Sequence, residues 1–309
     1  MNNAFLFPGQ GSQFIGMGKK LYENFTFCKN IYNLANNILG YDIMEISFHD
    51  SNELLNKTKY TQPAILIINF IIDKILKAYK ITPNINAGHS LGEFSALISS
   101  EVISFEDALK IIKIRSEAMQ NSEKNNPGSM IAVIGATQKQ IDTICNQKGI
   151  IVAANYNSKE QIVLSGDINA INSGIETAKS LGIKKIFKLN VSGAFHSPLM
   201  KQANKSLKEI INSTNFKNAK VPIIQNYKVL PLTNSDEIKK NIINQLENPV
   251  LWHQTINEIY KSKISTFYEV GPGKVLTNLT KRILKGYEYK MINYNELITR
   301  NMTDYEIIF

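Results

Sequence analysis

Residues 84–100 read NINAGHSLGEFSALISS, and this segment decides the fold class. Its alternation of apolar and small residues predicts a short strand at 84–87, a tight turn and a helix from about 91 to 100. The turn, GHSLG at 88–92, fits the G-x-S-x-G pattern that places a serine on a sharp strand-to-helix bend. The helix N-terminus favours negative charge there. We therefore expect an α/β fold with Ser90 as candidate nucleophile, or simply as a helix cap.

Strand and helix patterns continue on both sides of this segment. They predict a strand at 4–7 followed by a glycine-rich turn at 8–13, helices at 20–39 and 63–79, a helix capped by Ser104, helical structure from about 198, strands at 221–225 and 266–270, and a last helix after 271–273. Pro63 is expected in the first turn of its helix. Ser104 followed three residues later by Asp107 is typical of a helix start.

The middle of the chain has a different pattern. It predicts strands at 129–135, 150–154, 161–165 and 183–190, and helices at 138–147 and 167–181. The order βαββαβ over about sixty residues is that of a ferredoxin-like unit. Turns at 125–128 and 192–193 mark its two ends. We expect a catalytic subdomain of residues 1–126 and 195–290, an inserted ferredoxin-like subdomain of residues 127–194 and a tail of residues 291–309.

Composition limits the classes of function. The chain has 309 residues and a net charge of +9, which comes almost wholly from lysine and suits an acidic partner or substrate phosphates. It has no basic run with interleaved aromatics, so we expect no nucleic-acid partner. The longest apolar stretch, 64–72, is too short to span a membrane. Cys28 and Cys145 form no metal or disulfide motif, which indicates a reducing compartment and no metal site. We expect a cytoplasmic protein.

A serine nucleophile needs a base, and the chain has four histidines. His89 precedes Ser90 on the turn, so its side chain should point away from that of the serine. His49 and His253 lie in polar contexts. His196 lies in a loop of small residues at the return from the predicted insertion, and such loops often carry catalytic groups. His196 is thus the candidate base, with no acidic residue standing out as a third member.

Several separated motifs resemble one known family. They are FPGQGSQ at 7–13, GHSLGE at 88–93, Arg115 with Met119 and Gln120, VSGAFHS at 191–197, Gln245-Leu246 with Asn248-Pro249-Val250, and EVGPGKVL at 269–276. In this order they resemble the malonyl-CoA:acyl carrier protein transacylases of fatty-acid and polyketide synthesis. The resemblance covers about residues 4–285. It implies an α/β-hydrolase-like large subdomain with an inserted ferredoxin-like small subdomain.

The resemblance also implies roles in catalysis. Ser90 would attack the thioester carbonyl, with His196 as general base and then acid. The backbone N–H groups of Gln10 and Leu91 would form the oxyanion hole. In this family a backbone carbonyl near Gln245, rather than a carboxylate, orients the histidine. This would account for the missing third member.

The same resemblance implies the substrate. Arg115 has isoleucine at positions 111, 112 and 114, so its part of the helix is expected to be buried, and a buried arginine needs an anionic partner. In the family this arginine binds the free carboxylate of malonyl in a bidentate manner. A solvated arginine on a helix face is the alternative.

Three further residues are predicted at the substrate site. Phe195 resembles the malonyl-selective form, in which the ring excludes an α-methyl group. His89 and Asn155 resemble family positions beside the cleft, although turn formation explains Asn155 equally well.

The predicted reaction uses malonyl-CoA as substrate, an acyl carrier protein as partner and no bound cofactor. We expect a monomer. The sequence leaves open whether the carrier belongs to fatty-acid synthesis or, in trans, to polyketide synthesis. An acyl hydrolase that clears stalled acyl groups, and a non-catalytic protein that binds a carrier, remain the alternatives from other classes.

Overall fold

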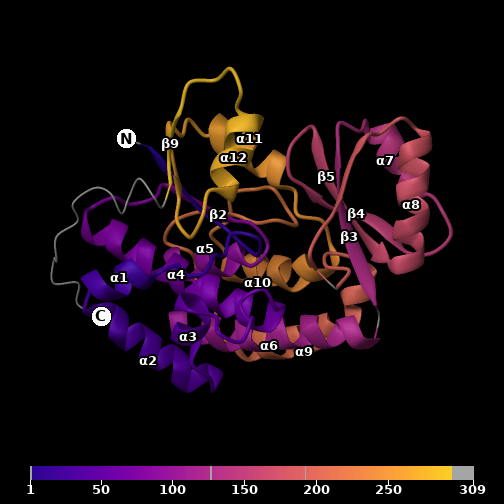
Figure 1. Cartoon of the computed structure of the whole chain (residues 1–309). Coiled ribbons are helices and arrows are strands. Elements are labelled where there is room, and N and C mark those ends of the chain that lie inside the picture. The colour runs from indigo at the N-terminus through magenta and orange to yellow at the C-terminus, as the bar shows by residue number, and fades with distance from the viewer. Residues whose placement is uncertain (1, 126, 192, 294–309) are drawn as a thin grey trace.

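Two β-sheets organise the chain in the computed structural model, which describes residues 2–125, 127–191 and 193–293 (Figure 1). The larger sheet is parallel, with the strand order β7-β2-β1-β8-β9. Its strands are β1 (Asn3–Phe7), β2 (Ile85–Gly88), β7 (Ile223–Ile224), β8 (Thr266–Glu269) and β9 (Lys290–Ile292). The α/β class predicted from the sequence is confirmed, because helices connect parallel strands and pack on both sides of them.

Helices from four parts of the chain surround the parallel sheet. They are α1 (Lys19–Asn24), α2 (Phe27–Leu39), α3 (Ile43–Phe48), α4 (Thr58–Ala78), α5 (Gly92–Ser99), α6 (Phe105–Asn125), α9 (Lys201–Ser213), α10 (Ser235–Asn244), α11 (Trp252–Lys261) and α12 (Val275–Ile283), with 3-10 turns at Pro198–Met200 and Gln245–Glu247. None of the helices in the described part of the chain combines the length and the apolar character needed to cross a bilayer.

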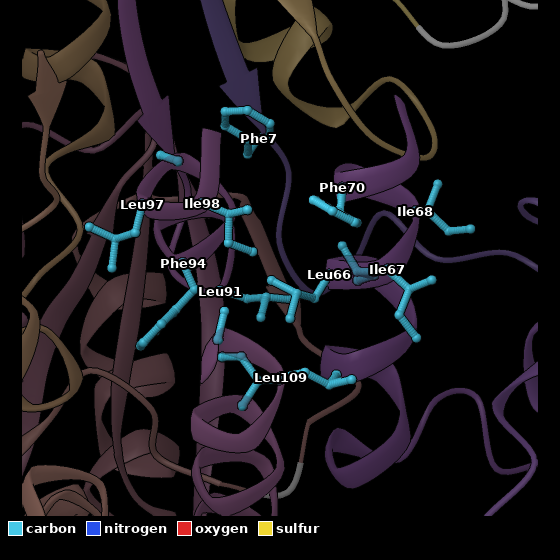
Figure 2. Close-up of a cluster of buried hydrophobic side chains, with 14 of the residues drawn as sticks. Phe7, Leu66, Ile67, Ile68, Phe70, Leu91, Phe94, Leu97, Ile98 and Leu109 are labelled. Carbon is cyan, nitrogen blue, oxygen red and sulfur yellow. The ribbon is translucent and has the colours of Figure 1, made fainter. Parts of the chain in front are cut away.

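The main hydrophobic core lies between β1 and the helices α4, α5 and α6. Figure 2 shows side chains from these elements converging, among them Phe7, Leu66, Phe94 and Leu109. Helix α4 is buried on nearly every face, because the helices α2, α3, α5 and α6 all pack against it. This explains why its sequence is apolar almost without interruption. Burial on this scale holds β1, β2 and α5 in fixed positions and so fixes the turn between β2 and α5.

The second sheet is antiparallel and lies at one end of the molecule, away from α1–α3 (Figure 1). Its elements are β3 (Gly128–Ile134), α7 (Gln138–Cys145), β4 (Ile151–Tyr156), β5 (Gln161–Asp167), α8 (Ile168–Ser180) and β6 (Lys185–Lys188), with the strand order β4-β5-β3-β6. It has its own hydrophobic core. Asn155 of β4 pairs with Val250, which ties this sheet to the segment before α11.

Two predicted helices differ from the observed ones. The pattern over 20–39 is broken into α1 and α2, because Phe25 is extended and its ring packs against that of Phe27, both being buried. Helix α4 begins at Thr58, five residues before the predicted first turn. Pro63 therefore lies inside the helix, where it cannot donate to the carbonyl of Lys59. That carbonyl instead accepts hydrogen bonds from the hydroxyls of Tyr41 and Ser116.

The predicted boundary between residues 290 and 291 falls inside a strand. Met291 and Ile292 of β9 pair with Phe267 and Tyr268 of β8, so the parallel sheet extends two residues into the predicted tail. Three residues at the edge of a sheet carry too little periodicity to be found from sequence. Residues 294–309 of the predicted tail lie outside the described residues, as do Asn126 and Ser192 of the predicted turns.

Candidate active site

Ser90 lies on the predicted sharp turn between β2 and α5. Its φ is 51°, a left-handed conformation that is rare for a residue with a side chain. The two glycines of the motif permit the turn. A Cβ atom on Gly88 would lie 2.0 Å from the carbonyl of Gly92, and one on Gly92 would lie 1.9 Å from the carbonyl oxygen of Phe7. Strand and helix can therefore approach this closely only with glycine at both positions.

His196 is the base that the structure brings to Ser90. Its Nε2 lies 2.8 Å from Oγ of Ser90, and its Nδ1 lies 3.0 and 3.2 Å from the carbonyl oxygens of Gln245 and Asn248. Carbonyl oxygens only accept, so Nδ1 carries the proton and Nε2 is free to accept from the serine. Burial, reinforced by the positive charge of Arg115, lowers the pKa of His196 to about 3. The imidazole is thus neutral and can act as a base.

Arg115 of α6 is 1% exposed and reaches the same serine. Its Nη2 donates to Oγ of Ser90 and to Oε1 of Gln245, each at 3.1 Å, and its Nη1 donates to Oε1 of Gln62 at 2.6 Å. Its Nε has no hydrogen-bond partner among the described residues. The guanidinium also packs over the ring of Phe94. A buried cation with a spare donor is suited to bind an anionic substrate group.

Ser90, His196 and Arg115 line one cavity of about 170 Å³ between the parallel sheet and the antiparallel sheet. The other residues predicted at the site that line it are Gln10, His89, Leu91, Asn155 and Phe195, and further lining residues include Gln62, Met119, Met130, Asn157, Val163, Leu189, Val191 and Leu276. Gln245 lies behind Ser90 and Arg115, where it contacts both. The structure thus brings every predicted site residue to one place, although its geometry alone does not assign their roles.

The loop after β1 packs directly on the turn that carries the serine. A Cβ atom on Gly9 would lie 2.4 Å from the carbonyl oxygen of His89 and 3.6 Å from the nitrogen of Leu91. This contact brings the backbone of Gln10 beside the start of α5. The N–H of Ser90 is occupied, because it donates to Oδ1 of Asn226. The N–H groups of Gln10 and Leu91 therefore remain the candidates for an oxyanion hole.

His89 lines the same cavity as Ser90 but contacts other residues. Its Nε2 lies 2.9 Å from Oδ1 of Asn157, and its ring packs edge-on against Trp252. Burial lowers the pKa of His89, so this imidazole is also neutral. The remaining histidines lie elsewhere: His49 is exposed at the end of α3, and His253 is half-buried on α11.

Sequence reasoning missed four polar residues that surround the site. They are Gln62, Glu93, Gln225 and Asn226, all nearly or fully buried. Glu93 occurs in the quoted motif GHSLGE, and a charged side chain at the start of a largely apolar helix is a signal of a buried polar network. Asn226 has no such local signal. Within the described ranges, His, Cys, Asp and Glu side chains form no group of three that could hold a metal ion.

Comparison with known proteins agrees with this geometry. The acyl transferase domain family matches residues 4–308. A malonyl CoA-acyl carrier protein transacylase of Bacillus subtilis (strain 168) is 39% identical over 284 residues, which is 91% of this chain and 90% of that protein. The transacylase structure from Coxiella burnetii is 34% identical with a TM-score of 0.91, covering 96% of each chain.

A malonyl-transacylase solved in complex with a type II polyketide synthase acyl carrier protein is also 34% identical, with a TM-score of 0.91 over 97% of this chain and 98% of that one. These likenesses extend through both sheets and the site between them. The chain therefore belongs to the acyl transferase family, among the malonyl CoA-acyl carrier protein transacylases.

Proposed function

We propose that this protein transfers malonyl from malonyl-CoA to the phosphopantetheine thiol of an acyl carrier protein, through an acyl-enzyme on Ser90. One observation carries the proposal: a neutral imidazole and a buried guanidinium both contact the same serine Oγ, at 2.8 and 3.1 Å. The first is suited to activate the serine. The second is suited to bind the free carboxylate that distinguishes malonyl from simple acyl groups.

In the first half-reaction His196 takes the proton of Ser90 as Oγ attacks the thioester carbonyl. The carbonyl oxygen becomes an oxyanion, which the N–H groups of Gln10 and Leu91 stabilise. When the tetrahedral intermediate collapses, the C–S bond breaks and the CoA sulfur takes the proton from His196. In the second half-reaction the carrier thiol gives its proton to His196 and attacks the malonyl ester. His196 then returns that proton to Oγ of Ser90.

Arg115 would hold the malonyl carboxylate during both half-reactions. Its unpartnered Nε and its two Nη atoms offer the planar donor fork that a carboxylate accepts. Phe195, Met130 and Val163 form apolar walls of the cavity, which limits water beside the ester. Transfer to a thiol can then compete with hydrolysis. His89 and Asn155 would complete the substrate site.

We further propose that the two sheets correspond to two subdomains. The parallel sheet, with the serine on a turn after a strand, suits an α/β-hydrolase-like subdomain of residues 1–126 and 195–290. The order βαββαβ, with the strand order β4-β5-β3-β6, suits a ferredoxin-like insertion of residues 127–194. Residues 291–309 would be a tail, whose first two residues complete strand β9. The cleft between the two subdomains would then be the substrate site.

All the proposed catalytic groups come from one chain, so we propose that the monomer is the active unit and that it uses no bound cofactor. The free thiols of Cys28 and Cys145 suit a reducing, cytoplasmic compartment. The carrier could belong to fatty-acid synthesis or, in trans, to polyketide synthesis. The lysine-rich surface implied by the net charge of +9 suits an acidic carrier of either kind.

The proposal is tested by incubating the protein with a panel of acyl-CoA thioesters and measuring its intact mass. Malonyl-CoA should give a stable adduct that is absent in Ser90→Ala and that a holo carrier protein removes. Rapid release of CoA without a carrier would instead favour the hydrolase. Carrier binding without an adduct would favour a non-catalytic binding protein. Parallel assays with a fatty-acid and a polyketide carrier would show which one is loaded faster.

A further inference from the structure

The main chain of Ser90 is held by two amide side chains from distant parts of the sequence. Oδ1 of Asn226 accepts from the N–H of Ser90 at 2.7 Å, and Nε2 of Gln245 donates to the carbonyl oxygen of Ser90 at 2.8 Å. Asn226 also donates from Nδ2 to the carbonyl oxygen of Gly88 at 2.6 Å, so one side-chain amide bridges Gly88 and Ser90 within the turn. These bonds fix a residue whose φ of 51° is unfavourable on its own.

One buried carboxylate holds both residues, Asn226 by its main chain and Gln245 by its side chain. Glu93, in the first turn of α5, is fully buried. Its Oε2 accepts from the backbone N–H of Asn226 at 2.9 Å and from Nε2 of Gln245 at 3.1 Å, and its Oε1 accepts from Nε2 of Gln225 at 2.8 Å. Burial raises the pKa of Glu93, and the three N–H donors and Arg115 oppose that rise. Three donors around two oxygens are the surroundings of a carboxylate.

The neighbours of Gln245 fix which way its side-chain amide points. A side-chain amide can present either its oxygen or its nitrogen to a neighbour. Because the carbonyl oxygen of Ser90 and the carboxylate of Glu93 both accept, Gln245 directs Nε2 to the two of them. Its Oε1 then faces Nη2 of Arg115, at 3.1 Å. Through Gln245, Ser90 and Arg115 are therefore both linked to the carboxylate of Glu93.

We propose that Glu93 is a positioning residue for acylation of Ser90: through Asn226 and Gln245 it holds the serine main chain, and with it Oγ, in line with His196. The inference rests on the proposed function, which supplies malonyl-CoA as the natural acyl donor. The test also measures the reactivity of the serine directly. An alkyl fluorophosphonate modifies an activated serine, and the reagent carries no carboxylate that would have to bind to Arg115. A packing role for Glu93 would predict that an apolar side chain of similar length serves as well.

Two substitutions separate these roles. Glu93→Met keeps the length and removes both acceptor oxygens. Glu93→Gln keeps one oxygen, which can take the place of Oε2 and accept from the backbone N–H of Asn226 and from Nε2 of Gln245. The rate of Ser90 modification would be followed by intact mass, in single turnovers with malonyl-CoA and with the fluorophosphonate. Glu93→Met should slow the limiting rate with both reagents on the order of 10²-fold, the cost of a misplaced reacting atom. The half-saturating malonyl-CoA concentration should change less than about threefold.

Glu93→Gln should recover most of the lost rate. Wild-type rates in Glu93→Met would overturn the proposal. It would also be overturned if Glu93→Gln reacted as slowly as Glu93→Met, because the loss of rate would then come from the missing charge and not from the missing hydrogen bonds. If Glu93→Met does not melt cooperatively, Asn226→Ala and Gln245→Met carry the test, the latter keeping the carbonyl that His196 uses. Each should slow fluorophosphonate labelling, and wild-type labelling in both would refute the inference.

A wild-type protein that reacts with the fluorophosphonate but takes no malonyl would contradict the proposed function instead. The comparison of Glu93 variants with the fluorophosphonate would still decide the positioning role.

Discussion

Nη2 of Arg115 donates to Oγ of Ser90 at 3.1 Å, on the same oxygen that bonds to His196. The guanidinium therefore lies next to the point of attack. In malonyl a single methylene separates the carboxylate from the thioester carbonyl, so a carboxylate bound to Arg115 leaves that carbonyl within reach of Oγ. Under the proposed function, the direct contact between Arg115 and Ser90 suits an acyl group whose carboxylate and carbonyl are close together, as they are in malonyl.

Arg115→Ala should abolish the preference for malonyl. Removing one partner of a buried charged pair costs about 2 kcal/mol or more, which is roughly 30-fold or more in kcat/KM for malonyl-CoA. Activity with acetyl-CoA should be retained or should rise, since that substrate has no carboxylate. Arg115→Lys is the matched control: it keeps the charge, loses the planar fork and should recover only part of the rate. Unchanged malonyl kinetics in Arg115→Ala would refute the role of this residue.

The sequence was sufficient to predict the elements around Ser90, because strand, turn and helix are encoded locally there. The G-x-S-x-G pattern requires glycine where backbone atoms would otherwise clash, and this requirement is visible in five residues. The βαββαβ order was likewise predictable, since each of its elements carries its own periodicity. His196 could be selected as base only by elimination among four histidines, and its bond to Ser90 spans 106 residues.

The polar network around the serine was not predictable in the same way. Asn226 lies 136 residues from Ser90, and nothing in its neighbours distinguishes it from a turn asparagine. Such contacts depend on how the sheet brings β2 beside β7, which is a tertiary property. The break between α1 and α2 was missed for a related reason. Helical periodicity continues through Phe25, but packing of its ring favours an extended residue there.

Gly9→Ala should impair catalysis more than stability. The new Cβ would meet the carbonyl oxygen of His89 at 2.4 Å, so the loop that carries the Gln10 N–H must move away from the serine turn. Loss of one oxyanion donor costs roughly 10²–10³-fold in kcat. Gln10→Ala is the control, because it keeps that N–H and removes only the side chain. Single-turnover acylation rates and melting temperatures of both variants would be compared; equal rates in the two variants would argue against a backbone donor at Gln10.

Phe195→Ala should admit an α-methyl group. The ring of Phe195 is 6% exposed and lines the cavity, so its removal opens space beside the acyl chain. One methyl group in an apolar pocket is worth about 1–3 kcal/mol, so the kcat/KM ratio of methylmalonyl-CoA to malonyl-CoA should rise by roughly tenfold or more. Val275→Ala, another lining residue but a partly exposed one, should leave that ratio unchanged. Equal ratios in the two variants would place the limit on substrate size elsewhere.

The pH dependence of serine activation should lack an inflection near the ordinary histidine pKa. Burial and Arg115 lower the pKa of His196 from 6.5 to about 3, so the base stays neutral well below pH 6. Fluorophosphonate labelling of Ser90 should therefore keep its rate from neutral pH down to about pH 5. The neutral probe is chosen because it does not titrate in this range. An acid limb centred near pH 6.5 that persists in Glu93→Gln, in which the buried carboxyl beside the serine cannot titrate, would contradict a buried, neutral His196.

The same lowered pKa has a consequence for stability, whose sign is opposite to that of a histidine paired with a carboxylate. The unfolded chain binds a proton at His196 below pH 6.5, whereas the folded chain does so only near pH 3. The stability that comes from keeping this imidazole neutral is thus fully present above pH 6.5 and is lost as the pH falls from 6.5 towards 3, by at most about 1.4 kcal/mol per pH unit.

His196→Gln cannot titrate, so its melting temperature should fall less than that of the wild type between pH 7 and pH 4.5. His89, whose pKa is also lowered by burial, is present in both proteins and cancels in the comparison. If the melting temperatures of the two proteins fell equally over this range, His196 would titrate at its ordinary pKa in the folded protein. The proposed base would then need another source of activation.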